Sequence, residues 1–170
     1  MTVWKSLLNN DPIPWLLENN NPSVRHIALK ELVKIPRSHP DFLASRQKIM
    51  KTGVVPRILA RQSPGGYWEK AEDFYVRTKY KGSVWTFIVL AELMADPEDP
   101  HIQKACEFIL DWSQDRKSGG FSYQGSLKGG GYHSGVLPCL TGNMTWGLIR
   151  FGRLDDPRVR GAIDWITAYQ

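Results

Sequence analysis

The chain has 170 residues, of which 42% are hydrophobic and 23% charged, a composition that fits one globular domain with a single sizeable core. The longest apolar run, SVWTFIVLAELMA, has about 13 residues, fewer than the roughly 18 that a membrane span needs. The N-terminus lacks the apolar segment of a signal peptide, so we expect a cytoplasmic protein. The net charge of +5 is spread along the chain without basic runs, which argues against a nucleic-acid partner.

Segments with helical periodicity alternate with connectors rich in glycine and proline, and no segment alternates as a strand does. The sequence therefore predicts an all-α fold. In chain order, the expected helices cover residues 12–18, 22–35, 40–51, 54–62, 82–95, 100–114, 142–152 and 157–170.

The first fifty residues are expected to form a HEAT-like helical hairpin that caps the rest of the chain. Their segment NPSVRHIALKELVKIP has the periodicity of a helix with one apolar stripe. The stripe consists of Val24, Ile27, Leu29, Leu32 and Val33.

The middle of the chain contains two kinds of helix. The helix at 82–95 is apolar around nearly its whole circumference, so it should be enclosed on most sides. The helix at 100–114 has one apolar face, on which Cys106 is interpreted as a core residue. The two form an inner and an outer helix, and the same order recurs at 142–152 and 157–170. The apolar face of the first outer helix consists of Ile102, Ala105, Cys106, Ile109 and Trp112.

The turns before the outer helices repeat as well. Asp99-Pro100 aligns with Asp156-Pro157, 57 residues later, and Asn21-Pro22 is a looser copy. Asp or Asn caps the free N–H groups of a helix start, and Pro suits the first helical position because its φ is preset. The spacing predicts an array of antiparallel helical hairpins.

A second feature recurs where outer helices end, namely a glutamine followed by a glycine and an aromatic residue. It resembles the QW repeat of squalene and hopene cyclases, which share an α/α toroid with protein prenyltransferase β subunits. The residues that carry the resemblance are Gln62 with Gly66 and Trp68, Gln114 with Gly120 and Phe121, and Gln170 at the end of the chain.

The resemblance covers about residues 50–170 and implies a partial α/α toroid. The chain would be a single all-α domain in which residues 1–50 are the cap and residues 51–170 are toroid-like hairpin repeats. In the family, the glutamine bonds to backbone at helix ends and the aromatic ring packs on the neighbouring hairpin. The chain has fewer hairpins than a full toroid. We therefore expect either a fragment of a longer protein, which contacts a missing C-terminal half, or a homo-oligomer.

The connector at 65–82 is the strongest candidate for a site, because it mixes aromatic, acidic and basic residues and could line a pocket for an apolar chain with a charged head. The catalytic candidates are Glu69, Glu72 and Asp73, and the candidates for substrate binding are Tyr67, Trp68, Tyr75, Arg77 and Tyr80. The alternative is that the aromatic rings anchor the loop and the charges are solvated. The segments ADPEDP and LDDP lie at turns and do not match the cyclases' Asp-x-Asp-Asp motif.

The second connector is rich in glycine between Gly119 and Gly135 and lacks a phosphate-binding Gly-Lys-Ser/Thr motif. We expect it to be a mobile lid or disordered. His133 and Cys139 at its end are candidate zinc ligands, since prenyltransferases bind zinc through Asp, Cys and His, but a catalytic zinc needs a third protein ligand. The alternative is a surface histidine and a thiol near a helix start.

Two functions remain open from the sequence. The first is a terpene-cyclase-like or prenyl-processing protein that acts on or binds an isoprenoid, with zinc as the one cofactor considered. The second is a non-catalytic binding or protein-interaction module on the same scaffold.

Overall fold

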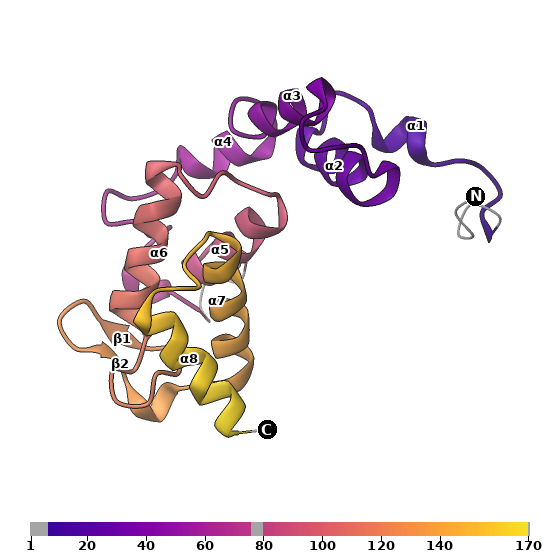
Figure 1. Cartoon of the computed structure of the whole chain (residues 1–170). Helices are drawn as coiled ribbons and strands as arrows, with labels where there is room; N and C mark the ends of the chain where they lie inside the picture. Colours follow the sequence, from indigo (N-terminus) through magenta and orange to yellow (C-terminus); the bar gives the residue numbers. More distant parts are fainter. Residues whose placement is uncertain (1–6, 76–79, 170) are drawn as a thin grey trace. The chain divides into compact units, whose positions relative to one another are not determined.

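The structure is a computed structural model that describes residues 7–75 and 80–169 (Figure 1). Contacts within the chain divide it into two compact units, Met1–Pro56 (unit 1) and Arg57–Gln170 (unit 2), close to the boundary expected at residue 50. Helices dominate both units, in broad agreement with an all-α fold. In the described residues, the one exception is a sheet of two very short strands. None of the described helices is long and apolar enough to cross a membrane.

Unit 1 is centred on two helices that pack against each other, α2 (Pro22–Ile27) and α3 (Pro40–Ile49). The side chain of Asn21 caps α2 by accepting a hydrogen bond from the N–H of Val24. Beyond Ile27 the helix continues with π-helical hydrogen bonding and ends at Lys34, whose φ of 58° is left-handed. The expected helix at 22–35 is therefore present, with a change of period halfway. The other helices are α1 (Ile13–Leu16) and α4 (Val54–Leu59), which crosses the division between the units.

The small core between α2 and α3 contains one polar pair. The imidazole of His26 lies 4.4 Å from the ring of Phe42, and its Nδ1 is hydrogen-bonded to the hydroxyl of Ser45 at 2.9 Å. Burial lowers the pKa of His26, which favours the neutral imidazole. Leu32 and Val33, expected on the apolar stripe of this hairpin, are exposed because they follow the change of helical period.

Unit 2 contains four longer helices. They are α5 (Ser83–Glu92), α6 (Pro100–Ser113), α7 (Pro138–Arg150) and α8 (Pro157–Ala168), and α7 contacts both α5 and α8 (Figure 1). The expected ranges were close, except that α7 begins at Pro138 because Leu137 is extended and proline occupies the first helical position. The predicted Asp caps are confirmed: the carboxylates of Asp99 and Asp156 accept backbone N–H bonds of 2.8 and 2.9 Å at the starts of α6 and α8.

The contact between α5 and α7 depends on a glycine. A Cβ at Gly147 would lie 2.5 Å from the ring of Phe87 on α5, so glycine lets α7 approach this buried ring closely. The ring of Phe151 then packs edge-on against Phe87 at 5.1 Å. All five residues expected on the apolar face of α6 are buried, and α5 is enclosed on most sides as expected, although Val89 is 43% exposed.

The glycine-rich connector is folded onto the C-terminal end of α6 instead of forming a free lid. Its strands β1 (Gly125–Ser126) and β2 (Gly130–Gly131) pair with each other and contact α6 (Figure 1). A Cβ at Gly125 or Gly131 would lie about 2 Å from the carbonyl oxygen of Trp112 or Ser113. Side chains are excluded here because backbone lies directly on backbone, which explains the glycines.

Candidate functional site

Two glutamines at helix ends make the same pair of contacts. The side-chain amide of Gln62 donates to the carbonyl oxygen of Gly66 at 3.2 Å and to that of His101 in the first turn of α6 at 2.9 Å. The amide of Gln114 donates to the carbonyl oxygen of Gly119 at 2.8 Å and to that of Arg158 in the first turn of α8 at 2.6 Å. Each glutamine therefore joins its own turn to the start of a later helix, α6 for Gln62 and α8 for Gln114. We call the two arrangements clasp 1 (Gln62) and clasp 2 (Gln114).

The backbone of the two clasps is closed by equivalent hydrogen bonds. In clasp 1 the N–H of Ser63 donates to the carbonyl oxygen of Tyr67 at 2.8 Å. In clasp 2 the N–H of Asp115 donates to that of Gly120 at 2.9 Å. This pairing aligns Tyr67 with Gly120, so the counterpart of Gly66 is Gly119, one residue before the expected Gly120.

Glycine is required at both aligned positions. Gly66 and Gly119 share a φ of +87°, which is left-handed. Gly66 packs against the backbone of α6 and Gly119 against that of α8. A Cβ at Gly66 would lie 2.4 Å from the carbonyl oxygen of Lys104 on α6, and one at Gly119 would lie 2.6 Å from that of Gly161 on α8. Any side chain would force the connector away from the next helix.

The aromatic residues of the clasps are anchored to α5 and α7. The backbone N–H of Trp68 donates to the hydroxyl of Ser83 on α5 at 3.1 Å, and that of Phe121 donates to the hydroxyl of Thr141 on α7 at 2.9 Å. Both rings are buried, and the indole N–H of Trp68 donates to the carbonyl oxygen of Ile58 at 2.9 Å. Trp68, a candidate for substrate binding, is therefore occupied in the clasp. Gln170 lies outside the described residues.

The candidate catalytic carboxylates lie on the outside of the first connector. Glu69 and Glu72 are exposed, and Asp73 is half-buried in a short 3-10 turn, Ala71–Asp73. Glu69 has a left-handed φ of 62°. Two of the three candidate carboxylates therefore face solvent.

The aromatic candidates of this connector gather on α5 instead. The ring of Tyr75 stacks on that of Trp85 at 6.3 Å, and the ring of Tyr80 lies 5.7 Å from the same indole. Tyr80 is 73% exposed, and Tyr67 lies apart from this group, against Phe108 at 5.1 Å. Arg77 lies outside the described residues.

Tyr75 also lies close to the thiol of Cys139 at the start of α7. Burial, together with the nearby Cys139, raises the pKa of Tyr75, so the phenol stays neutral at physiological pH. Tyr75 thus connects α5, through Trp85, with the N-terminal end of α7. The indole N–H of Trp85 is buried and has no hydrogen-bond partner among the described residues.

An arginine joins the other ends of the same two helices. The guanidinium of Arg150 lies 5.6 Å from the ring centroid of Trp146, and its Nη2 lies 2.6 Å from the sulfur of Met94 and 3.5 Å from the carbonyl oxygen of Ala91. Ile149 beside it is 38% exposed. The surface between the two joints is mainly apolar, and we call it the α5/α7 face. It consists of Tyr75, Trp85, Val89, Cys139, Trp146 and Ile149.

The two candidate zinc ligands have different partners. Nδ1 of His133 lies 2.7 Å from Oδ2 of Asp115, the residue after the clasp glutamine, whereas Cys139 contacts Tyr75. Within the described residues, no three His, Cys, Asp or Glu side chains are grouped as a metal site. The structure therefore does not bring His133 and Cys139 together with a third ligand. Cys106 is a core residue as predicted, and burial raises its pKa to about 12.

Asp115 was not among the predicted residues, although it organises the start of the second connector. Burial alone would raise its pKa, but hydrogen bonds from Ser118, from His133 and from the N–H groups of Lys117 and Ser118 outweigh burial and lower it. Its carboxylate accepts the Ser118 hydroxyl at 2.6 Å. The Gln-Asp-x-x-Ser spacing, typical of a side-chain-capped turn, was the available signal.

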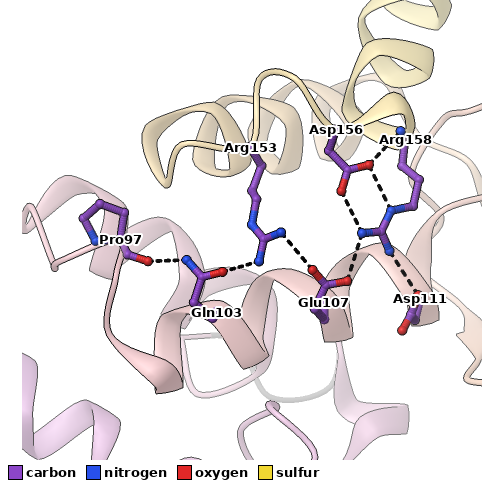
Figure 2. A network of polar contacts seen from close by, with 7 residues as sticks. All are labelled: Pro97, Gln103, Glu107, Asp111, Arg153, Asp156 and Arg158. Atoms are coloured by element: carbon purple, nitrogen blue, oxygen red, sulfur yellow. Dashed lines mark hydrogen bonds and ion pairs between the residues drawn. The ribbon is translucent and has the colours of Figure 1, made fainter.

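A polar network, also missed from the sequence, ties α6 to the start of α8 (Figure 2). Arg158 is its centre, with contacts of 2.7 Å to Asp156, 2.9 Å to Glu107 and 3.2 Å to Asp111. The hydrogen bond from Arg158 is the main reason why the pKa of Asp156 is lowered. The network therefore fixes the helix start that clasp 2 also contacts.

Arg153 extends this network along α6. It pairs with Glu107 at 3.0 Å and donates to Gln103, whose amide donates to the carbonyl oxygen of Pro97 (Figure 2). Gln103, Glu107 and Asp111 are four residues apart, so they share one helical face, which lies outside the apolar face predicted for this helix. This face carries structural contacts.

When the chain is compared with known proteins, no family model, no curated protein and no solved structure matches it.

Proposed function

We propose that residues 51–170 form part of an α/α-toroid-like array and that the α5/α7 face binds an apolar chain of the isoprenoid class. The array is supported by the two clasps, in which glutamine, glycine and aromatic residue have equivalent contacts. Each clasp glutamine reaches the first turn of the next outer helix, at His101 and at Arg158. In such an array α5 and α7 are inner helices, whose open face would line the interior.

The composition of the α5/α7 face carries the ligand assignment. Aromatic and aliphatic side chains prevail on it, and its ends are joined by Tyr75 and Arg150. Trp85 and Trp146 offer flat apolar surfaces, and Val89 and Ile149, each within one turn of one of these indoles on its own helix, remain exposed. Covering such side chains with a hydrocarbon chain is favoured by about 25 cal/mol for each Å² of apolar surface removed from water. The partnerless indole N–H of Trp85 offers one donor for a polar end group.

Binding is favoured over catalysis, because the carboxylates lie in the wrong environment. Protonation of an alkene needs a carboxylic acid shielded from water, whereas Glu69 and Glu72 are exposed. Two alternative functions therefore remain. The first is prenyl transfer or cyclisation by Glu69, Glu72 or Asp73, and the second is an interaction module whose α5/α7 face contacts another protein.

The test is a titration of the purified chain with farnesol, farnesyl diphosphate and dodecanol, followed by calorimetry. We expect saturable binding of the prenyl compounds. Val89→Asp should weaken it at least about tenfold, because a charged group would enter the apolar contact. Leu154→Asp is the matched control, since Leu154 is 39% exposed, similar to Val89 at 43%, and lies outside the face.

Absence of saturable binding, or equal losses in the two variants, would contradict the ligand assignment. Mass spectrometry of the same mixtures tests the catalytic alternative. Product formed from squalene or a prenyl diphosphate, and lost in Glu72→Gln, would replace binding by catalysis.

A further inference from the structure

The positive charge of the protein is concentrated in unit 1. Residues 1–56 contain eight Lys and Arg and four Asp and Glu, a net charge of +4, whereas residues 57–170 contain fourteen and thirteen, a net charge of +1. The sequence alone hides this asymmetry, because the cations are spread without runs. Only the division of the structure shows that four of the five excess charges belong to one small unit.

Part of this charge lines a shallow groove between α2 and α3. The groove has a volume of about 280 Å³, and its lining includes Arg25, Lys48 and Lys51 and a single acidic residue, Asp41. Asp41 lies 3.7 Å from Arg25. Lys48 and Lys51 are exposed, and in the described part of the chain no carboxylate pairs with them. The groove therefore presents two uncompensated ammonium groups.

Exposed apolar side chains occur on α1 and α3 of the same small unit. Leu43, which is 47% exposed, precedes Gln47 of the groove by one turn on the same face of α3. Trp15 on α1 is 69% exposed, and no residue of α1 is buried. Arg25 donates a hydrogen bond to the carbonyl oxygen of Leu17, which ties the end of α1 to the groove.

We propose that unit 1 docks on an anionic phospholipid surface through a lipid patch, defined as Trp15, Arg25, Leu43, Lys48 and Lys51. Cations attract the phosphate and carboxylate headgroups, and Trp and Leu side chains enter the boundary between headgroups and acyl chains. A duplex nucleic acid would use the cations but would leave Leu43 and Trp15 without a partner. The coincidence of both side-chain types favours lipid, and the inference is independent of the ligand bound by unit 2.

The test is sedimentation of the whole chain with vesicles of phosphatidylcholine containing 30% phosphatidylserine. We expect binding at an ionic strength of about 0.05 M that is largely lost at about 0.5 M, because the Debye length shortens roughly threefold. Lys48→Ala combined with Lys51→Ala should weaken binding about 30-fold, since each cation near the surface contributes about fivefold. The matched control is Lys117→Ala combined with Lys128→Ala, which removes two exposed cations from unit 2.

Trp15→Ser tests the apolar part of the lipid patch. It should weaken vesicle binding several-fold and leave the salt dependence unchanged, because no charge is removed. Circular dichroism should show the same helix content in all variants, as all these side chains are on the surface. Three outcomes would overturn the proposal: no binding to the anionic vesicles, equal losses in the two lysine pairs, or equal binding of a 20-base-pair DNA duplex at the same phosphate concentration.

Discussion

The connectors after Gln62 and Gln114 begin alike and then differ. Both start with a clasp that reaches the first turn of a later helix, α6 or α8. After Trp68 the first connector turns to solvent, with Glu69 and Glu72 exposed, whereas after Phe121 the second folds back over the end of α6. The comparison teaches that a run of glycines can indicate backbone packed on backbone instead of mobility, and that the charged side chains of a connector, such as Glu69 and Asp115, can be either solvated or buried.

The largest expected effect comes from the aromatic anchors. Phe121→Ala and Trp68→Ala should each lower the free energy of unfolding by about 3–5 kcal/mol, because each empties a buried site. Urea denaturation of both variants measures this. Tyr80→Ala, at a ring that is 73% exposed, should change stability by less than about 0.5 kcal/mol. A small loss of stability in only one of the two variants would contradict the equivalence of the two clasps.

Substitution of the clasp glycines should have the next largest effect on stability. Gly66→Ala and Gly119→Ala should each cost about 3 kcal/mol, because each adds a Cβ at a left-handed φ and within 2.6 Å of a carbonyl oxygen. The control is Gly161→Ala in α8, where a Cβ meets nothing within 4 Å. That change should stabilise the protein by about 0.5–1 kcal/mol. Thermal unfolding of the three variants would separate the positions, and tolerance of Ala at Gly119 would refute its alignment with Gly66.

The two clasp glutamines should differ in how much they contribute to stability. Gln114 is buried and makes bonds of 2.8 and 2.6 Å, so Gln114→Ala should cost about 1–3 kcal/mol. Gln62 is half-buried and its bonds are 3.2 and 2.9 Å, so Gln62→Ala should cost about 1 kcal/mol. Chemical denaturation of the single variants sharpens the comparison. A larger loss at Gln62 would contradict the ranking by burial.

The smallest expected effect is a dependence of stability on pH that distinguishes the second connector from the first. Because the pKa of Asp115 is lowered in the folded protein, its stabilising contribution is complete above the ordinary carboxyl pKa of about 3.9 and is lost as pH falls through the lowered value. Asp115→Asn should therefore flatten the decline of stability below about pH 4. Ser63 occupies the aligned place in clasp 1, so Ser63→Ala should leave the pH profile unchanged.

Helix positions could be predicted from the sequence because they depend on local signals. Asp99 and Asp156 with the prolines that follow them specify helix starts through hydrogen bonds within two residues. The clasp pattern was also visible, but its alignment was not, since Gly119 and Gly120 are equivalent until Gly161 of α8 lies against one of them. The candidate binding site could not be predicted either, because it also depends on contacts between distant segments. Tyr75 and Trp85 come together only through the path of the connector, which no local rule fixes.

The sequence by itself determined the helical class, the Asp-Pro helix starts and the glutamine and aromatic residues of the two clasps, because each follows from a local pattern over a few residues. Only the tertiary structure decided which charges are solvated and which are structural. Glu69, a catalytic candidate in the sequence, faces water, and Glu107, which was not a candidate, holds Arg158. The reason is that burial and ion pairing depend on which segments meet, and residues 51 positions apart in the chain, such as Glu107 and Arg158, meet only after the helices have packed.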